Sequence, residues 1–330
     1  MTQPTRILSG MRATNPRLHL GNYEGALRPW VELQSQHQMF CMVADWHGLT
    51  ELKSEPQEIA KNAREVAKDF VAAGLDPDRC NIFIQSHVKE HAELSLLLGM
   101  VSSVGKLERN PTYKDHLAAS EGNEGSLSYG LLGYPVLQSA DILLYKPYGV
   151  PVGKDQAPHL ELSREIARSF NSKFGEVFPM FKDIISQDES RSKVPGLDMR
   201  KMSKSYDNCI YLSDTADETA KRIKSAFTTP TKIKMTDPGI PEGCAICQYL
   251  KLYDPDYQQK WDEDIRGERG CSKSKQELTE IINEYLRPFR ERRVSMTDGD
   301  IEAILKNGAE GARAVAAQTM DEVRRAMRLA

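Results

Sequence analysis

Short apolar runs alternate with amphipathic segments over the first half of the chain. The runs predict four buried strands, at residues 6–10, 39–45, 81–85 and 150–153. Between them, residues 21–34 carry apolar side chains at helical spacing, and residues 56–74 form a helical pattern that opens with proline and closes on glycine. This alternation predicts an α/β fold with a doubly wound, parallel, Rossmann-like sheet.

Strand signals fade past about residue 190, and the rest of the chain has a mainly helical pattern. Residues 311–330 form one amphipathic helix with a stripe made by Val315, Thr319, Val323 and Met327. We therefore expect a Rossmann-like catalytic domain at residues 1–190 and a junction loop at 191–210. A helical domain at 211–300 follows, and then a C-terminal helix at 301–330 that packs back toward the first domain.

Composition limits the classes of protein that fit this pattern. The chain has 330 residues, more than one domain usually contains. Its net charge is −3, so a nucleic-acid partner would have to be met by a local basic patch. We see no membrane span and no signal-peptide pattern, and six cysteines without framework spacing indicate reduced thiols. We expect a cytoplasmic protein.

The standard phosphate-binding loops of nucleotide folds are missing from the sequence. There is no GxGxxG, and the nearest approach to a Walker loop runs from Gly99 to Lys106 with Leu107 in the place of Ser or Thr. We predict that this stretch is simply helix. A dehydrogenase or a P-loop enzyme is therefore disfavoured.

A different phosphate signal lies in the sequence RLHLGN, residues 17–22. A turn that leads into a glycine-opened helix lets phosphates approach the backbone, and His19 and Asn22 are three residues apart, so both can face one ligand. The alternative is an ordinary histidine satisfied at a helix start. Both interpretations stay open for this motif taken alone.

The sequence KMSKS, Lys201 to Ser205, places two lysines in a short loop after the pair Pro195 and Gly196. A solvated basic turn is the simpler interpretation. However, a lysine pair at the domain junction and an anion site at the first strand–helix turn could hold a triphosphate from two sides, because lysine follows a phosphate as a mobile point charge.

The sequence YPVLQSADILLY predicts a helix with one polar face. Tyr134, Gln138, Asp141 and Tyr145 share that face, and the other positions serve the core through Val136, Ala140, Leu143 and Leu144. A carboxylate flanked by aromatic rings can accept a hydrogen bond from a ring N–H or a hydroxyl. A second polar cluster follows the strand at 150–153, where open α/β sheets bind ligands, and consists of Gly153, Asp155, Gln156 and His159.

At these residues the chain resembles the class I aminoacyl-tRNA synthetases. HLGN is similar to the HIGH signature with Asn22 in the last position, and KMSKS matches the second signature letter for letter. The block from Tyr134, YPVLQSADILLYKPYGVPVGKDQAPHLEL, resembles the bacterial tryptophanyl-tRNA synthetases in particular, as do RILSGMR, GNYEGAL and LERNPTYK. The resemblance is strongest up to about residue 210.

The resemblance implies two adjoining binding sites. For tryptophan it implies that Asp141 accepts the indole N–H, that Tyr134 and Gln156 lie near the α-amino group, and that the walls come from Leu8, His47, Gln138 and Val152. For ATP it implies contacts from Arg12, Ala13, Thr14, Gly21, Asn22, Gly153, Lys154, Asp155, Val194, Lys201, Met202, Ser203, Lys204 and Ser205. The catalytic residues it implies are His19, Asn22, Lys201 and Lys204.

Two departures from the family pattern affect these assignments. Several members carry Met where this chain has Gln138, which makes the pocket wall more polar here. The turn RATNPRLHLGN is one residue longer than the usual form, which changes the spacing between Arg12, Thr14 and the HLGN signature.

The activity that the resemblance implies is tryptophan–tRNA ligation. L-tryptophan and ATP with Mg²⁺ would give tryptophanyl-adenylate, and the aminoacyl group would pass to tRNA(Trp). Residues 211–300 would recognise the anticodon, and a homodimer without membrane contact is expected. Two alternatives stay open: a tyrosyl-tRNA synthetase, in which the same helix face reads a phenol, and a non-catalytic synthetase paralogue.

Cysteines in the second half form a partial metal-binding pattern. Cys244 and Cys247 make a C-x-x-C, Cys271 follows, and Ser274 stands where a further cysteine would complete the iron–sulfur set that some bacterial members carry. Three thiolates fall short of a cluster or a structural zinc site. We therefore expect no bound metal and no iron–sulfur cluster.

Overall fold

A five-stranded parallel sheet forms the centre of the molecule, in the order β3-β2-β1-β4-β5. The computed structural model describes residues 5–50, 56–123, 125, 127–153, 157–185, 191, 193–229 and 231–329. The strands are β1 (Arg6–Arg12), β2 (Gln38–Ala44), β3 (Cys80–Ile84), β4 (Gly149–Pro151) and β5 (Lys182–Ile184). The prediction of a doubly wound α/β fold is thus confirmed. The strand β5 went unpredicted, because its residues are exposed or half-buried and form no apolar run.

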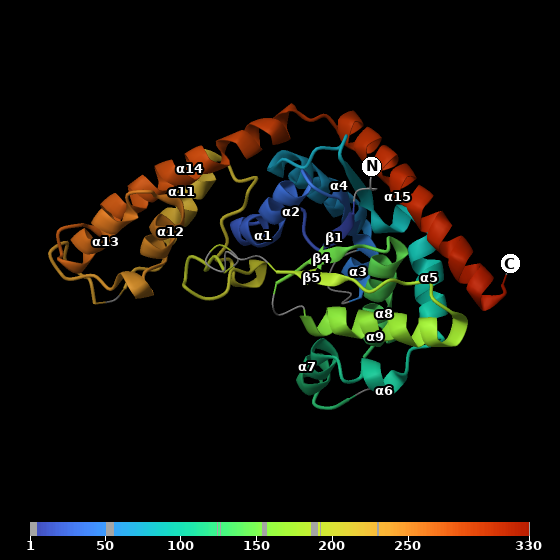
Figure 1. The fold of residues 1–330 in the computed structure, drawn as a ribbon. Coiled ribbons are helices and arrows are strands. Elements are labelled where there is room, and N and C mark those ends of the chain that lie inside the picture. The colour runs from blue at the N-terminus through green and yellow to red at the C-terminus, as the bar shows by residue number, and fades with distance from the viewer. Residues whose placement is uncertain are drawn as a thin grey trace.

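Helices cover both faces of this sheet (Figure 1). Alternate residues of the strands point to opposite faces, so Ile7 and Met39 join one apolar cluster while Leu8 and Phe40 join the other. The first cluster includes Phe70 of α4 (Pro56–Ala73), the helix predicted at residues 56–74. The second includes side chains of α8 (Tyr129–Leu144) and α9 (Ala157–Phe174).

The helix after β1 is interrupted by a wider turn. It consists of α1 (Leu20–Asn22), a π-helical turn (Tyr23–Leu27) and α2 (Arg28–Leu33). The short helix α3 (Asp45–Leu49) follows β2 directly. α3 thus begins where β2 ends, and α1 begins after the turn that follows β1, so both lie at the edge of the sheet where ligands of such folds bind.

The stretch from Gly99 to Lys106 is not one helix, so that prediction is wrong. α5 (Glu90–Gly99) ends there, and α6 (Val104–Leu107) starts after Ser103, whose backbone is extended at φ −85° and ψ 138°. α7 (Pro111–Ala119) follows and is capped by Asn110. The apolar residues across the gap gave a continuous pattern, which hid the break in the backbone.

Four helices project away from the sheet as a separate group (Figure 1). They are α11 (Ala216–Ser225), α12 (Ala245–Tyr253), α13 (Tyr257–Ile265) and α14 (Cys271–Ser295). The last of them, α14, returns to the sheet and contacts α4 there. Arg293 pairs with Asp69 and Glu65, and Arg292 Nε donates to the carbonyl oxygen of Ala72 at 2.7 Å.

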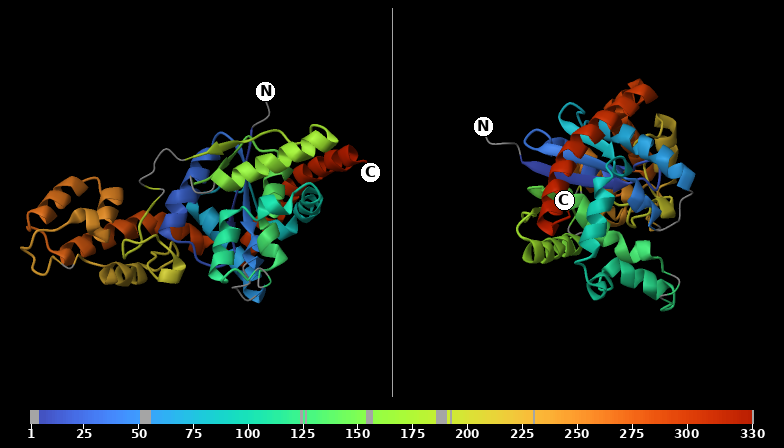
Figure 2. Two further views of the ribbon diagram at one scale, coloured as in Figure 1. Left: turned by 90° about the horizontal axis from the view of Figure 1, so that it is seen from below. Right: turned by 90° about the vertical axis from the view of Figure 1, so that its right-hand side faces the viewer.

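The C-terminal helix α15 (Asp298–Met327) packs along β3 and α5 on one side of the sheet (Figures 1 and 2). A Cβ atom on Gly308 would lie 2.0 Å from the carbonyl oxygen of Ile82, so the helix approaches the strand as closely as glycine permits. The helix begins ahead of residue 301, because Thr297 and Asp300 form a capping box. No helix among the described residues is long and apolar enough to cross a membrane.

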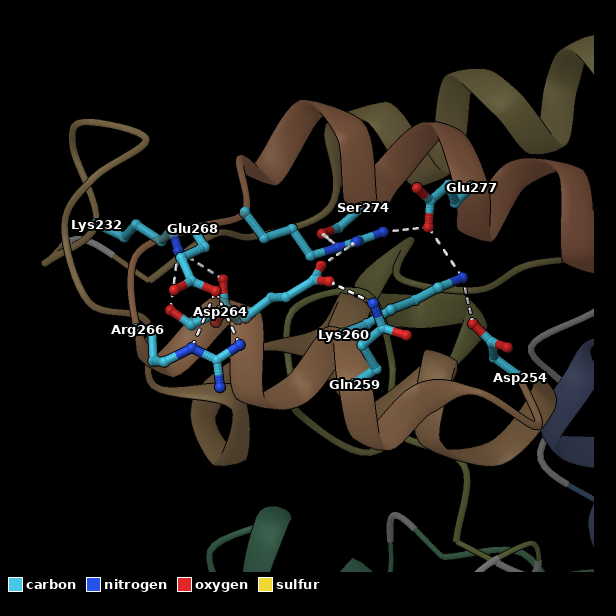
Figure 3. Close-up of polar contacts among 11 residues, drawn as sticks. Lys232, Asp254, Gln259, Lys260, Asp264, Arg266, Glu268, Ser274 and Glu277 are labelled. Carbon is cyan, nitrogen blue, oxygen red and sulfur yellow. Dashed lines mark hydrogen bonds and ion pairs between the residues drawn. The ribbon is translucent and has the colours of Figure 1, made fainter.

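Charged side chains between α13 and α14 form what we call the ion cluster (Figure 3), which consists of Lys232, Asp254, Lys260, Glu263, Asp264, Arg269 and Glu277. Lys232 Nζ lies 2.6 Å from Asp264 Oδ1, and Lys260 Nζ lies 2.5 Å from Asp254 Oδ2. Arg269 is 4% exposed and pairs with both Glu263 and Glu277. Each cation in this cluster therefore has a carboxylate partner.

A buried glutamate joins the helix after β1 to the projecting helices. Glu24 is 3% exposed, and its Oε1 accepts hydrogen bonds from the hydroxyls of Tyr253 at 3.2 Å and Tyr285 at 2.6 Å. Its Oε2 lies 3.3 Å from Arg28 and 3.4 Å from Arg191. Two of these four donors come from α12 and α14, so this carboxylate connects the two parts of the fold.

Candidate active site

A cavity of about 440 Å³ lies at the carboxyl ends of β1 and β4. The chain continues from β1 toward β2 on one side and later adds β4 on the other, so this is the point where the strand order reverses. Its walls include residues of β1, of the helix after it and of α8, among them Leu8, Arg12, Gly25, Ala26, Trp30, His47, Tyr134, Gln138, Asp141, Val152, Gly153 and His159.

Asp141 is a buried carboxylate on the wall of this cavity, with 3% of its surface exposed. Gln85 Nε2 donates to both of its oxygens, at 2.8 and 2.9 Å. His91 Nδ1 lies 2.7 Å from Oδ1, and His47 Nε2 lies 2.9 Å from Oδ2. Because a carboxylate only accepts hydrogen bonds, both facing imidazole nitrogens carry protons.

The network around Asp141 extends one residue further, to Tyr145. The hydroxyl of Tyr145 lies 2.8 Å from His91 Nε2, and since Nδ1 of this ring donates to Asp141, a neutral His91 accepts the tyrosine proton. Burial and the charge of Asp141 raise the pKa of Tyr145 well above its usual range, which keeps that proton in place. Tyr145 therefore supports the site from the core, whereas the sequence placed it on the ligand-facing side of the helix.

Asp141 stays ionised at neutral pH. Burial by itself would raise the pKa of this carboxyl, but the neighbouring His91 and the hydrogen bonds from His47 and His91 outweigh burial and lower the pKa below its usual value. The cavity wall therefore carries a fixed negative acceptor, which suits a ligand with a weakly acidic N–H or O–H.

The HLGN turn adopts a capped helix start. His19 Nδ1 accepts from the backbone N–H of Asn22 at 3.2 Å, and Asn22 Oδ1 accepts from the backbone N–H of His19 at 3.1 Å. This arrangement leaves the Nε2–H of His19 and the side-chain NH₂ of Asn22 as donors toward a ligand. The structural and functional interpretations of this motif are thus compatible. A Cβ on Gly21 would lie 3.2 Å from His19 Nδ1, so the turn leaves little room there for a larger residue.

The KMSKS loop packs directly against the HLGN turn. His19 and Tyr211 form an antiparallel bridge, and the backbone N–H of Leu20 donates to the carbonyl oxygen of Ile210 at 2.9 Å. Met202 is buried, with its sulfur 3.4 Å from the backbone nitrogen of Gly21. The two signatures, about 180 residues apart in the sequence, therefore meet at one edge of the sheet.

Asn208 shapes the KMSKS loop from its buried side. Its Oδ1 accepts from the backbone N–H of Ser203 at 2.8 Å, and its Nδ2 donates to the carbonyl oxygen of Lys201 at 3.1 Å and to Asp198 at 2.7 Å. A Cβ on Gly196 would lie 2.1 Å from Asn208 Nδ2, so this glycine is required for the asparagine to fit.

The two lysines of the loop differ in exposure. Lys201 is exposed, while Lys204 is half-buried beside His19, and its ammonium group makes no hydrogen bond or ion pair with any described residue. Burial lowers the pKa of Lys204 to about 8. Burial and the nearby Lys204 lower the pKa of His19 to about 4, so this imidazole is neutral at physiological pH.

The structure brings most of the predicted site residues to this edge of the sheet. Leu8, His47, Tyr134, Gln138, Asp141, Val152, Gly153 and Arg12 line the cavity. Ala13 and Val194 are buried in the apolar core, which limits them to backbone contacts with a ligand, while Thr14 is exposed. Lys154, Asp155 and Gln156 lie outside the described residues.

Several residues around the site carry no signal in the sequence pattern. Gln85 holds Asp141 from the turn directly after β3 and His91 holds it from α5, while Asn110 contacts Tyr134 from the start of α7. Below the HLGN turn, buried Asp69 accepts from the backbone N–H of Leu18 at 3.2 Å, and burial raises the pKa of this carboxyl to about 6. Each is distant in sequence from the residue it supports, so spacing could not reveal it.

The cysteines of the helical region lie close together without forming a described metal site. Cys244 and Cys247 are buried at the start of α12, and Cys271 is the first residue of α14. A hydrogen bond with Cys247 lowers the pKa of Cys244 to about 7. Within the ranges that the structure describes, no group of three His, Cys, Asp or Glu side chains could hold a metal ion.

Comparison with known proteins agrees with this geometry. Residues 1–287 match the family of class I tRNA synthetases for W and Y. A tryptophan–tRNA ligase of Thermotoga maritima is 44% identical over 331 residues, which cover 98% of this chain and 99% of the relative. A tryptophan–tRNA ligase of Aquifex aeolicus is 40% identical over 397 residues and covers 98% of this chain and 100% of the relative.

A solved structure is similar over the same length. The tryptophanyl-tRNA synthetase of Campylobacter jejuni, complexed with ADP and tryptophan, has a TM-score of 0.87 and 33% identity, and the match covers 98% of this chain and 99% of that one. The sheet order, the two adjoining signatures and these full-length relatives lead to one conclusion: the chain belongs to the class I tRNA synthetases for tryptophan and tyrosine, and within them to the tryptophan–tRNA ligases.

Proposed function

We propose that the chain activates L-tryptophan with ATP, forming tryptophanyl-adenylate and pyrophosphate, and then transfers the tryptophanyl group to the 3′ end of tRNA(Trp). The observation that carries the proposal is the buried, ionised Asp141 on the wall of a cavity whose other side is the helix of the HLGN turn. Support comes from relatives named tryptophan–tRNA ligase and from the Campylobacter jejuni structure with ADP and tryptophan.

In this proposal Asp141 selects the amino acid. A carboxylate offers about four acceptor positions; His91 and His47 each take one on Asp141, and the single amide nitrogen of Gln85 is shared between both oxygens. The indole N–H would take one of the two positions that Gln85 shares. A ligand without a matching donor would leave this buried charge short of a partner, which is a far stronger basis for rejection than a lost apolar contact.

The phosphates would lie against the HLGN turn and the KMSKS loop. His19 Nε2–H and the side-chain amide of Asn22 donate hydrogen bonds, and the ammonium groups of Lys201 and Lys204 meet the β- and γ-phosphates as pyrophosphate departs. The tryptophan carboxylate attacks the α-phosphorus without a covalent enzyme intermediate, so the protein contributes positioning and charge. Mg²⁺ would enter with ATP, since magnesium at such sites is held largely by substrate phosphates.

An ATP–pyrophosphate exchange assay with each amino acid in turn tests the proposal. We expect exchange with L-tryptophan and not with L-tyrosine. Exchange that follows tyrosine would favour the tyrosyl alternative, and no exchange with any amino acid would favour a non-catalytic paralogue. Charging of tRNA(Trp) by the same preparation would then establish the second step.

Three further parts of the proposal concern partners and location. Residues 211–300 would recognise the anticodon, since their helices project from the sheet (Figure 1). A homodimer would use the exposed apolar side chains Leu96, Met100 and Val104, and sedimentation of a Met100→Lys variant as a monomer would support this. The location would be the cytoplasm, which fractionation of cells that express the chain would test.

A further inference from the structure

Asn110 stands directly before α7 and contacts the cavity residue Tyr134, yet the mechanism above gives it no part. Its side chain is 6% exposed. Asn110 Oδ1 accepts from the backbone N–H of Thr112 at 2.9 Å and from the hydroxyl of Tyr134 at 3.2 Å. Asn110 Nδ2 lies 3.2 Å from His159 Nδ1. The three partners differ in chemistry, and together they determine which way the amide of Asn110 faces.

The backbone N–H of Thr112 decides how the amide is turned. This group can only donate, so the oxygen of Asn110 must face it and the NH₂ must face His159. The NH₂ in turn can only donate, so His159 Nδ1 is an unprotonated acceptor and its proton sits on Nε2. His159, which lines the cavity, is therefore neutral in this arrangement.

The same logic fixes the hydroxyl of Tyr134. A carbonyl oxygen cannot donate, so in its bond with Asn110 the tyrosine must give its own proton. The hydroxyl oxygen then presents only lone pairs to other groups. While this bond is made, the hydroxyl proton points to the buried Asn110 and not into the cavity.

We propose that Asn110 is a positioning residue that makes Tyr134 an acceptor for the α-ammonium group of tryptophan. The inference rests on the proposed function. Tryptophan carries two donor groups, the indole N–H and the α-ammonium. Asp141 lies seven residues along α8 from Tyr134, a rise of about 10 Å, and both residues line the same cavity, so each can face a different donor of one ligand.

The experiment compares ligands with and without the ammonium group. Dissociation constants of L-tryptophan, tryptamine and indole-3-propionate are measured by calorimetry for the wild type, Asn110→Ser and Asn110→Asp. Serine keeps the cap of α7 but is too short to reach Tyr134, whereas aspartate keeps both the cap and the acceptor, with His159 carrying its proton on Nδ1 instead. A thermal melt of each variant checks that the fold is intact.

We expect Asn110→Ser to bind tryptophan and tryptamine about tenfold more weakly, the scale of one hydrogen bond, with indole-3-propionate unchanged. Asn110→Asp should stay close to the wild type for all three. In a Tyr134→Phe background, Asn110→Ser should have no further effect on tryptophan.

Equal losses for tryptophan and indole-3-propionate, or additive effects of the two substitutions, would overturn the role of Asn110. A wild-type protein that binds no tryptophan at all would instead overturn the proposed function, so the two failures are distinguishable.

Discussion

The cavity at the end of the sheet and the ion cluster of the helical region bury charge in opposite ways. In the ion cluster, Asp264 has the ammonium of Lys232 at 2.6 Å. In the cavity, the described partners of Asp141 are one amide and two imidazoles. The lysines differ likewise, since Lys204 makes no ion pair with a described residue, and burial lowers its pKa to about 8.

This difference distinguishes charges that stabilise the fold from charges that are available to bind a ligand. Burying a charge without a counter-ion is costly, so a protein keeps one where a bound partner later completes it. The charges of the ion cluster already have partners, so removing one of them should lower the stability of the fold and leave the exchange activity unchanged. Four measurements test the comparison, beginning with the largest expected effect.

Asp141→Asn should lower kcat/KM for tryptophan in the exchange reaction by about 10³-fold, because the amide removes the charged acceptor and turns a donor toward the imidazoles. The KM for ATP should change little. A loss of less than tenfold would mean that Asp141 belongs with the structural carboxylates, and the comparison would fail.

Lys204→Ala should lower the exchange rate by about 10²-fold while tryptophan affinity stays near that of the wild type, since the lost ammonium faces the phosphates alone. Lys173→Ala is the matched control, because Lys173 is exposed at the far end of α9. Equal losses in tryptophan binding and exchange would contradict the role of Lys204.

Lys232→Met should lower the free energy of unfolding by about 3 kcal/mol, because it leaves Asp264 buried without its cation. Chemical denaturation measures this loss, and exchange activity at 25 °C should remain. Adding Asp264→Asn should recover part of the stability. An exchange defect on the scale expected of Asp141→Asn would show that the ion cluster is not merely structural.

The pH profile gives the smallest effect. Lys204 has a pKa of about 8, so it loses its positive charge as the pH rises through that value. The value of kcat/KM for ATP should therefore fall several-fold between about pH 7 and pH 9, roughly one unit either side of the pKa. The arginine of a Lys204→Arg variant stays charged over this range, so kcat/KM for ATP should not show this fall at high pH. With a pKa of about 4, His19 should add no change above pH 5.

The sequence predicted much of the fold, because the spacing of apolar residues that marks a helix or a strand can be read within a short segment of the chain. The strands β1 to β3 and the helix α4 came from apolar spacing and glycine punctuation, and Val136, Ala140, Leu143 and Leu144 of α8 are all buried as expected. The strand β5 was not predicted, because it contains no apolar run. The break after Gly99 was not predicted either, because apolar residues lie on both sides of it.

The residues that hold the ligand-facing side chains in place were harder to predict from the sequence than the ligand-facing residues themselves. Asp141 and His47 could be named from a family resemblance, but Gln85 and His91 reach Asp141 from other elements of the fold. Asn208 lies three residues after the KMSKS signature, yet nothing in its spacing shows that it holds three partners around the loop. Such contacts depend on tertiary structure, which periodicity does not encode.

The buried Glu24 gives the molecule a mechanical property. Its donors Tyr253 and Tyr285 belong to the projecting helices, while its own backbone continues from Asn22 of the phosphate turn. α14 has 25 residues and is about 37 Å long, and it contacts Glu24 through Tyr285, the fifteenth of its residues. A movement of this helix as a rigid body would therefore displace Glu24 and, two residues before it, Asn22.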